Sequence, residues 1–305
     1  MTTQQLLAIA IDGLIYASWL FIIAVGLTLI YGVMKILNIA HGSLYALGAF
    51  TSVTFTSAWF AHGYPVMGSY AMLALAAVVV GLVAGPVIER GLLRFLYGKD
   101  EVVLVLVTYA LFLILEDLIK LVWGVDPLFI QGPKGETPYA LLGNFSIGSL
   151  NYPTYNLLLV GVAITTAIVL TWVLARTRAG KLLIAVIHDR ETAAAMGIDV
   201  GRTYFVTFTL GAMLAAVGGA LTAPTVSVVT GMGAEVIVIA FAVVVIGGLG
   251  SLPGAALGAL IVGLVRAASI HLRPELELFA VYFVMAAVLI VRPKGLFSAA
   301  EVRRI

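Results

Sequence analysis

Apolar runs long enough to cross a membrane follow one another along almost the whole chain. The first, residues 6–34, contains one charged side chain, Asp12, and similar runs recur as far as Val291. A helix needs about 20 apolar residues to cross the hydrocarbon core of a bilayer. Because 62% of the 305 residues are hydrophobic and only 10% are charged, no polar region remains that is large enough to fold in water by itself. We predict a single all-α polytopic membrane domain over residues 1–305.

The rest of the composition excludes several kinds of protein. The chain has no cysteine, which excludes disulfides and thiolate metal sites, and its four scattered histidines argue against a dedicated metal centre. A net charge of +2 is too small to indicate a nucleic-acid partner. The first basic residue is Lys35, and the first apolar run is too long for a secretory signal. We expect this run to remain in the protein as a spanning helix.

Eight to nine membrane segments are predicted, and the last third of the chain is responsible for the range. Six spans are clear, at residues 6–34, 36–60, 67–88, 102–122, 155–175 and 204–228. Two shorter runs follow at 236–249 and 255–270, separated by the sequence GGLGSLPG, and a last run covers 276–291. We therefore predict a Gly/Pro-broken segment near 236–270 and a final helix.

The Gly/Pro break has two interpretations. Irregular backbone within a membrane is tolerated where protein buries it or where it lines a wet cavity, which makes Gly247 and Gly248 candidates for the translocation pathway. Alternatively, the break is a tight turn between two short helices, and the residues alone favour neither interpretation. The spacing of Gly250, Gly254 and Gly258 favours close helix packing over contact with a ligand.

The distribution of Lys and Arg predicts how the chain is oriented. Cytoplasmic loops carry an excess of basic residues. Nine segments with an external amino terminus place most of the 17 Lys and Arg residues on the cytoplasmic side, whereas fusing 236–270 into one span moves several of them outside. We therefore favour nine segments and a cytoplasmic carboxyl terminus. Residues 124–153 then form an external loop, which is a solvated connector by default but is long enough for a docking rim or plug.

Residues 176–202 form one polar stretch in this apolar chain. Within it, the sequence ETAAAMG at 191–197 favours a short helix that ends at Gly197, with Arg190 and Arg202 on either side. Such a helix suits insertion into a groove of a partner protein. An ordinary basic loop that fixes the orientation explains the same pattern equally well.

Motifs in this stretch and elsewhere resemble a known family. Glu191, Thr192, Ala193 and Gly197 match the spacing of the coupling loop in membrane subunits of ABC importers. Three further stretches are similar to LivH-type permeases of branched-chain amino acid importers: GLTLIYGVMKILNIAHGS at 26–43, AAMGI at 194–198 and VIGGLGS at 245–251. The resemblance covers about residues 13–297, and its most specific part is the Asn-Ile-Ala-His-Gly stretch. The chain departs from the general importer pattern at Thr207, where Ile is usual, and in lacking the Leu-Pro that normally follows.

The resemblance implies a non-catalytic subunit of a larger assembly in the bacterial inner membrane. Its partners would be two cytoplasmic ABC ATPase subunits, a second related permease or a second copy of this chain, and a periplasmic amino-acid-binding protein. ATP and Mg would be held by the ATPase subunits, since this chain has no Gly-x-x-x-x-Gly-Lys-Ser/Thr phosphate loop. Branched-chain amino acids are the implied solutes, and urea or short amides are the nearest alternative.

Few residues mark a path for the solute. Asn38, His41 and Ser43 begin the second predicted span and offer hydrogen bonds to a zwitterion. By the predicted topology they lie near the cytoplasmic side, where a structural role at the helix start is favoured.

Carboxylates inside a membrane are functional candidates by default, and the chain has four of them near span ends: Asp12, Glu116, Asp117 and Glu235. All four fall close to the external ends, where an interfacial position is favoured and where Lys120 can pair with Glu116. Glu235 is the best functional candidate because it opens the broken segment.

Three other classes of protein fit the residues less well. An ion-coupled secondary transporter normally carries charged residues at the centres of its spans, and we expect none there. A gated channel would leave the polar stretch at 176–202 unexplained. An intramembrane enzyme would need a catalytic pair, and the sequence has no His-Glu-x-x-His motif or clearly spaced Ser/Lys dyad.

Overall fold

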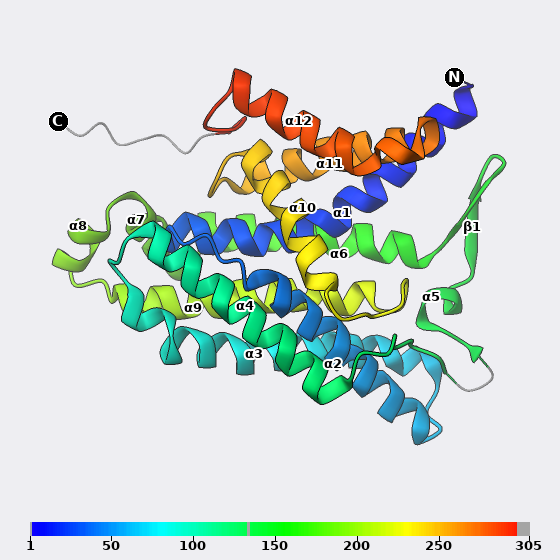
Figure 1. The fold of residues 1–305 in the computed structure, drawn as a ribbon, viewed down its shortest axis with the longest axis horizontal. Helices are drawn as coiled ribbons and strands as arrows, with labels where there is room; N and C mark the ends of the chain where they lie inside the picture. Colours follow the sequence, from blue (N-terminus) through cyan, green and yellow to red (C-terminus); the bar gives the residue numbers. More distant parts are fainter. Residues whose placement is uncertain (1, 133–134, 298–305) are drawn as a thin grey trace.

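The computed structural model describes residues 2–132 and 135–297, which form a bundle of helices with one small β-hairpin (Figure 1). The long helices are α1 (Thr3–Met34), α2 (His41–Ala61), α3 (Ser69–Gly91), α4 (Glu101–Trp123), α6 (Tyr155–Arg176), α9 (Val200–Thr222), α10 (Met232–Gly247), α11 (Leu252–Leu272) and α12 (Glu277–Val291). The short elements are η1 (Val66–Gly68), η2 (Leu93–Leu96), α5 (Pro138–Leu141), β1 (Asn144–Ile147), β2 (Leu150–Pro153), α7 (Arg178–His188), α8 (Arg190–Ala195) and η4 (Pro274–Leu276).

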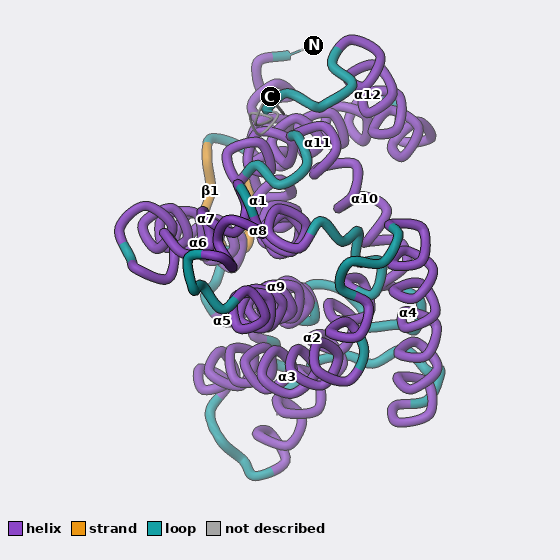
Figure 2. Tube along the Cα trace, turned by 90° about the vertical axis from the view of Figure 1, so that its left-hand side faces the viewer, coloured by secondary structure: helices purple, strands orange, loops and turns teal. Residues whose placement is uncertain are grey.

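The short elements mark the two ends of the bundle. Helices α7 and α8 lie at one end, which we call the α8 end, and α5 lies with the antiparallel β1–β2 hairpin at the other, which we call the hairpin end (Figure 1). The amino terminus is at the hairpin end. Seen along the bundle, α3, α9, α1 and α11 are stacked in that order, with α12 outermost (Figure 2).

Six helical stretches are long and apolar enough to cross a membrane, which confirms an all-α polytopic membrane protein. They are Thr3–Met34, Val66–Leu96, Glu101–Trp123, Tyr155–Arg176, Val200–Thr222 and Leu252–Leu272. Five of them correspond to spans that were clear from the sequence. The sixth, α11, is longer than the short run predicted at 255–270. Helices α10 and α12 are apolar but shorter, and α2 does not meet the same criteria.

A tight turn separates α10 from α11 in the Gly/Pro-broken region. Gly248 and Gly250 have φ of 106° and 81°, and Ser251 caps α11 by accepting a hydrogen bond from the Gly254 amide at 3.1 Å. A Cβ atom at Gly254 would lie 2.3 Å from the Gly247 carbonyl oxygen, and one at Gly258 would lie 2.3 Å from that of Val243. The glycine spacing therefore serves close helix packing at these two positions, as expected.

Helix α1 runs through the centre of the bundle, and its side chains from Leu20 to Ile30 are almost completely buried. Beside it, α2 and α9 cross at backbone contact. A Cβ atom at Gly219 would lie 1.9 Å from the Tyr45 carbonyl oxygen, and one at Gly48 would lie 2.3 Å from that of Ala216. Small residues permit such approach where lipid supplies no hydrophobic force to press helices together.

Helix α2 begins later and deeper in the bundle than the predicted span 36–60. Residues 35–40 are not helical, and the ring nitrogen Nε2 of His41 lies 3.0 Å from the Ile23 carbonyl oxygen. Ile23 lies about 16 Å along α1 from its last residue, Met34, so α2 starts about one third of the length of α1 back from that end. The predicted start of this helix at residue 36 was therefore wrong, because α2 begins at His41.

The non-helical stretch before α2 is stabilised by a residue distant in sequence. The Thr108 hydroxyl, on α4, donates to the Leu37 carbonyl at 3.1 Å and accepts from the Ile39 amide at 3.4 Å. Lys35 takes a left-handed conformation with φ of 56° to end α1. Protein thus satisfies the irregular backbone at this depth, which the bilayer could not do.

Candidate functional site

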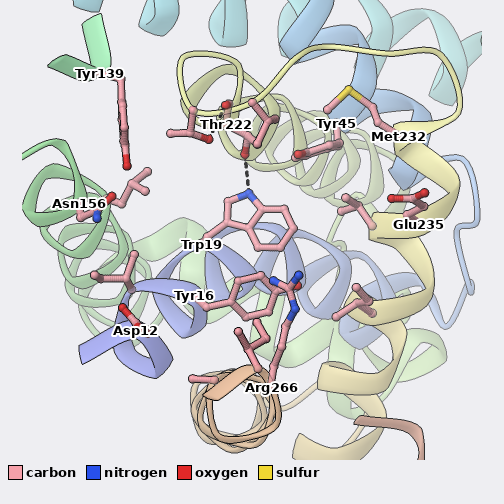
Figure 3. A pocket seen from close by; sticks show the side chains of 18 of the residues that line it. Asp12, Tyr16, Trp19, Tyr45, Tyr139, Asn156, Thr222, Met232, Glu235 and Arg266 are labelled. Carbon is pink, nitrogen blue, oxygen red and sulfur yellow. Dashed lines mark hydrogen bonds between the residues drawn. The ribbon is translucent and has the colours of Figure 1, made fainter. Parts of the chain in front are cut away.

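A cavity of about 610 Å³ opens among α1, α6, α10 and α11, toward the hairpin end (Figure 3). We call it the aromatic cavity. It is lined by Asp12, Ile15, Tyr16, Trp19, Tyr45, Tyr139, Asn156, Leu159, Thr222, Thr225, Val226, Ser227, Val229, Met232, Glu235, Val236, Ile239, Arg266, Ala267, Ile270 and His271.

One wall of the cavity consists of packed aromatic rings. The centroid of Trp19 is 5.0 Å from that of Tyr16 and 6.2 Å from that of Tyr45, and the Trp19 indole nitrogen donates a hydrogen bond to the hydroxyl of Thr222 (Figure 3). The aliphatic side chains of Val236 and Ile239 also line the space. The cavity therefore offers a fixed, mostly apolar surface with polar groups at its edges, as small-molecule sites usually do.

Charged groups in the cavity are mostly engaged with one another. Arg266 stacks on the ring of Tyr16, with 3.9 Å from guanidinium carbon to ring centroid, and forms an ion pair with Glu277. Asp12 lies 2.7 Å from the His271 ring nitrogen.

Glu235 is the exception among the cavity's charged groups. It lies exposed in the first turn of α10 and has no ion-pair partner within residues 2–132 and 135–297. Acidic side chains are favoured in the first turn of a helix, and Glu235 occupies that turn of α10 beside the cavity.

The polar stretch 176–202 is largely helical rather than a loop. Helix α7 occupies 178–188, and Asp189 then caps α8 by accepting hydrogen bonds from the Glu191 and Thr192 amides at 2.9 and 3.0 Å. The Thr192 hydroxyl also donates a hydrogen bond to Asp189. This bond is the largest contributor, and together with the two amide bonds it holds the pKa of the exposed Asp189 below its ordinary value. Gly197 ends the segment with φ of +83°.

The surface of α8 is largely open, and Ala193 is its buried residue. The Ala193 carbonyl accepts the Ile198 amide at 3.0 Å. Glu191 and Thr192 are exposed, and Met196 is 78% exposed. The short helix predicted at this place is confirmed, including its end at Gly197. Helix α8 projects from the bundle at the α8 end (Figure 1).

Comparison with known proteins decides the family. Residues 9–291 match the family described as the permease component of branched-chain amino acid transport systems. The chain belongs to this family. The resemblance noted in the sequence is thereby confirmed over nearly the whole permease.

Individual relatives agree in length as well as in sequence. This permease is 30% identical to the high-affinity branched-chain amino acid transport system permease protein BraD of Pseudomonas aeruginosa, over 97% of this chain and 96% of that protein. It is 26% identical to the LivH protein of the corresponding system of Escherichia coli, over 96% of both chains. A probable LivH protein of Methanocaldococcus jannaschii is 28% identical over 83% of this chain and 77% of its own. Among solved structures, PsaBC from Streptococcus pneumoniae in complex with Fab aligns with 92% of this chain and 89% of its own at 15% identity and a TM-score of 0.48.

Of the candidate pathway residues, Glu235 lines the aromatic cavity and the others lie elsewhere. His41 contacts Ile23 as described, and the Ser43 hydroxyl donates to the Phe112 carbonyl at 3.2 Å. Both hold the start of α2 against its neighbours. Asn38 is fully buried, and its amide atoms have no partner among the described residues.

Gly247 and Gly248 belong to the packing of the α8 end. The Gly247 carbonyl accepts the Phe297 amide at 2.9 Å, and a Cβ atom at Gly248 would lie 2.4 Å from the Phe297 carbonyl oxygen. In the described part of the chain, neither glycine is among the residues that line the aromatic cavity.

Glu116 is buried, and its predicted pairing with Lys120 was wrong. Lys120 pairs instead with Asp117 at 3.0 Å, while the Glu116 side chain is buried and accepts a hydrogen bond from the Gly231 amide at 3.0 Å. Gly231 immediately precedes α10, and Glu116 lies about 10 Å from the end of α4. Helix α10 therefore begins part-way along the bundle, as α2 does.

The starts of these two helices touch each other. A Cβ atom at Gly42 would lie 2.3 Å from the Gly233 carbonyl oxygen. Neither this junction nor the aromatic wall of the cavity was predicted, because Tyr16, Trp19 and Tyr45 look like ordinary apolar positions in their spans. The one local signal was the polar residues at 38–43 inside an otherwise apolar run.

Proposed function

We propose that this permease is the membrane subunit of an ATP-driven importer for branched-chain or similar hydrophobic amino acids. The observation that carries the proposal is the aromatic cavity: a space with aromatic and aliphatic walls and one carboxylate, Glu235, that forms no ion pair with the described residues, in a chain of this family. A zwitterion with a branched apolar side chain has the complementary chemistry.

The cavity residues have distinct roles in this proposal. Glu235 accepts the ammonium group of the solute, while Val236 and Ile239 contact its side chain. Arg266 is already neutralised by Glu277, so hydroxyl and amide donors such as Asn156 are left for the solute carboxylate. Substrate entry also displaces water from an apolar surface, which favours hydrophobic solutes.

Energy enters the permease at α8. The chain has no phosphate loop of its own, and we propose that two cytoplasmic ABC ATPase subunits, which bind ATP and Mg, dock on the exposed face formed by Glu191, Thr192 and Met196. Buried Ala193 anchors this face to the bundle, so a push on α8 is passed to the start of α9.

The proposed orientation places the α8 end in the cytoplasm and the hairpin end outside, with an external amino terminus and nine segments in the bacterial inner membrane. The basic residues of 176–202 at the α8 end support it. A periplasmic binding protein then meets the hairpin end. A second related permease, or a second copy of this chain, supplies the other half of the translocation path.

Copurification from the native membrane in mild detergent tests the assembly. We expect two ATPase subunits and a second permease subunit, with ATPase activity stimulated by the binding protein and leucine, isoleucine or valine. Stimulation by urea or a short amide, and not by these amino acids, would identify that compound as the solute. A protein without an ATPase partner would contradict the proposal and favour a channel or secondary transporter.

Variants at α8 test the coupling role in the same assembly. Charge reversal in Glu191→Lys and strain in Gly197→Val should leave the protein inserted but reduce uptake per ATP hydrolysed. The matched controls lie at the hairpin end: Glu275→Lys, also exposed, and Gly143→Val, which has φ of +67° and open space around it like Gly197. Normal coupling in both α8 variants would contradict the docking role.

A glutamine at Glu235 tests the role of the cavity. Glu235→Gln keeps the shape and removes the charge, so uptake of the zwitterion should require a higher solute concentration. Asp117→Asn serves as the control, because it also removes a charge at constant shape and Asp117 is a solvent-exposed carboxylate that pairs with Lys120. Equal uptake by both variants would show that Glu235 does not recognise the ammonium group.

A further inference from the structure

A second cavity, of about 900 Å³, lies at the α8 end beside the last turn of α3 and the start of α9. We call it the arginine pocket. It is lined by Glu89, Arg90, Arg94, Tyr97, Arg190, Asp199, Val200, Gly201, Arg202, Tyr204, Phe205 and Val206.

The pocket has an excess of positive charge. Four arginines face two carboxylates, and both carboxylates are engaged with other groups. Glu89 is buried and accepts a hydrogen bond from the Tyr97 hydroxyl, while Asp199 caps α9 by accepting the Arg202 amide at 2.9 Å. Within the described ranges, none of the four arginines forms an ion pair. The guanidinium groups therefore remain available to an anion.

Aromatic rings hold two of these arginines in place. The guanidinium carbon of Arg90 lies 4.2 Å from the ring centroid of Phe205, and that of Arg190 lies 5.6 Å from the ring centroid of Tyr204. Stacking of this kind lowers the entropy that an arginine loses when it binds a ligand. The first turn of α9, whose dipole also favours an anion, lines the same space.

An apolar edge adjoins the charged groups. Val206 lines the pocket and is exposed, and Val87 and Phe95 are 65% and 70% exposed on either side of Arg90 and Arg94 in the chain. Val87 and Phe95 lie in one helical stretch apolar enough to cross a membrane, and Val206 lies in another, so in the proposed orientation lipid tails would face them. The site therefore combines a cationic pocket with an adjacent apolar strip, which is the pattern of a phospholipid rather than of a small water-soluble anion.

We propose that the arginine pocket binds the phosphate of an anionic glycerophospholipid, with its acyl chains along Val87, Phe95 and Val206. Arginine pairs with phosphate through two parallel N–H···O bonds, and basic pockets between helices at the cytoplasmic side of membrane proteins bind such headgroups. The lipid would tie the end of α3 to the α8–α9 connection, since Arg90 and Arg94 come from the first and Arg190 and Arg202 from the second. The inference does not depend on which solute is carried, but the pocket lies beside the α8 face on which the ATPase is proposed to dock.

Native mass spectrometry of the purified full-length permease, titrated with phosphatidylglycerol, tests the site. The test variant is the double substitution Arg94→Gln and Arg202→Gln, because neither residue stacks on an aromatic ring. The matched control is Arg176→Gln with Lys181→Gln, which removes the same charge from exposed positions in the same polar stretch. At about fivefold per basic residue, the pocket variant should bind the lipid about 25-fold more weakly, and the control should not.

Two further arms identify the ligand. Phosphatidylcholine should bind weakly to both variants, and inorganic phosphate should fail to displace phosphatidylglycerol at equal concentration. Displacement by phosphate would assign the pocket to a free anion and overturn the lipid. Equal lipid binding by the pocket and control variants would overturn the site. So would a pocket variant that keeps the lipid but loses copurifying ATPase, because the arginines would then belong to a protein interface.

Discussion

Replacement of Gly219 by alanine tests the close crossing of α2 and α9. The added methyl group would lie 1.9 Å from the Tyr45 carbonyl oxygen and 2.9 Å from the Ala49 amide nitrogen, whereas real Cβ atoms essentially never come closer than 3.0 Å. Both neighbours are backbone atoms of α2, which no change of rotamer can move aside. The two helices must therefore separate by about 1 Å, which breaks the close packing along the whole crossing.

The expected cost follows from that geometry. Overpacking of a tight interior costs about 1–3 kcal/mol, and a clash between rigid backbones belongs at the upper end of that range. Alanine also gains about 1 kcal/mol over glycine from helix propensity, which offsets part of this cost. Gly161, on α6, supplies the matched control because a Cβ atom there meets nothing within 4 Å. The difference between the two variants isolates the packing cost, at about 3 kcal/mol.

The assay is reversible unfolding of purified protein in mixed micelles of mild detergent and SDS, followed by tryptophan fluorescence. We expect Gly161→Ala to be as stable as the parent or more stable, and Gly219→Ala to unfold at a lower SDS fraction. Equal free energies of unfolding for the two variants would refute the close crossing of α2 and α9.

Three further predictions concern buried and capping polar groups. Glu116→Ala leaves the Gly231 amide unsatisfied and should lower the free energy of unfolding by about 1–3 kcal/mol, while Glu116→Gln keeps an acceptor and should cost less; equal losses would contradict this hydrogen bond. Thr108→Val removes the hydroxyl that satisfies two backbone groups before α2, so thermal unfolding in detergent should occur at a lower temperature than in Thr108→Ser. Because the folded-state pKa of Asp189 is depressed, its capping of α8 is present above the ordinary value of 3.8 and is lost as the pH falls through the folded-state value. Amide hydrogen exchange in α8, corrected for intrinsic rates, should therefore accelerate in acid, and Asp189→Ala should abolish that dependence.

Local sequence patterns predicted what depends on local chemistry. Apolar runs of about 20 residues located most of the long helices, since the bilayer demands that length of any spanning helix. The end of α8 at Gly197 also followed from the sequence, because a left-handed residue after a short helix favours glycine. Glu235 was singled out by its place at the start of the broken segment, and it does line the aromatic cavity.

Features that depend on distant residues could not be predicted in this way. The start of α2 is displaced to His41 because Thr108 satisfies the backbone before it, and nothing near residue 38 indicates that partner. Glu116 looked interfacial because Lys120 follows one turn later, yet the Gly231 amide binds it instead. The cavity wall combines Trp19 with Tyr45 and Thr222, three residues that no sequence spacing brings together.

The burial of α2 has a consequence for how the protein is made. This helix holds polar residues such as Ser52 and Thr56 with no exposed surface, and it is not among the helices apolar enough to span a membrane by length and composition. Lipid alone would therefore retain it poorly during synthesis, and its main packing partner, α9, emerges from the ribosome some 140 residues later. Until α9 arrives, the growing chain depends on the insertion machinery or on α1 and α3 to keep α2 in the membrane.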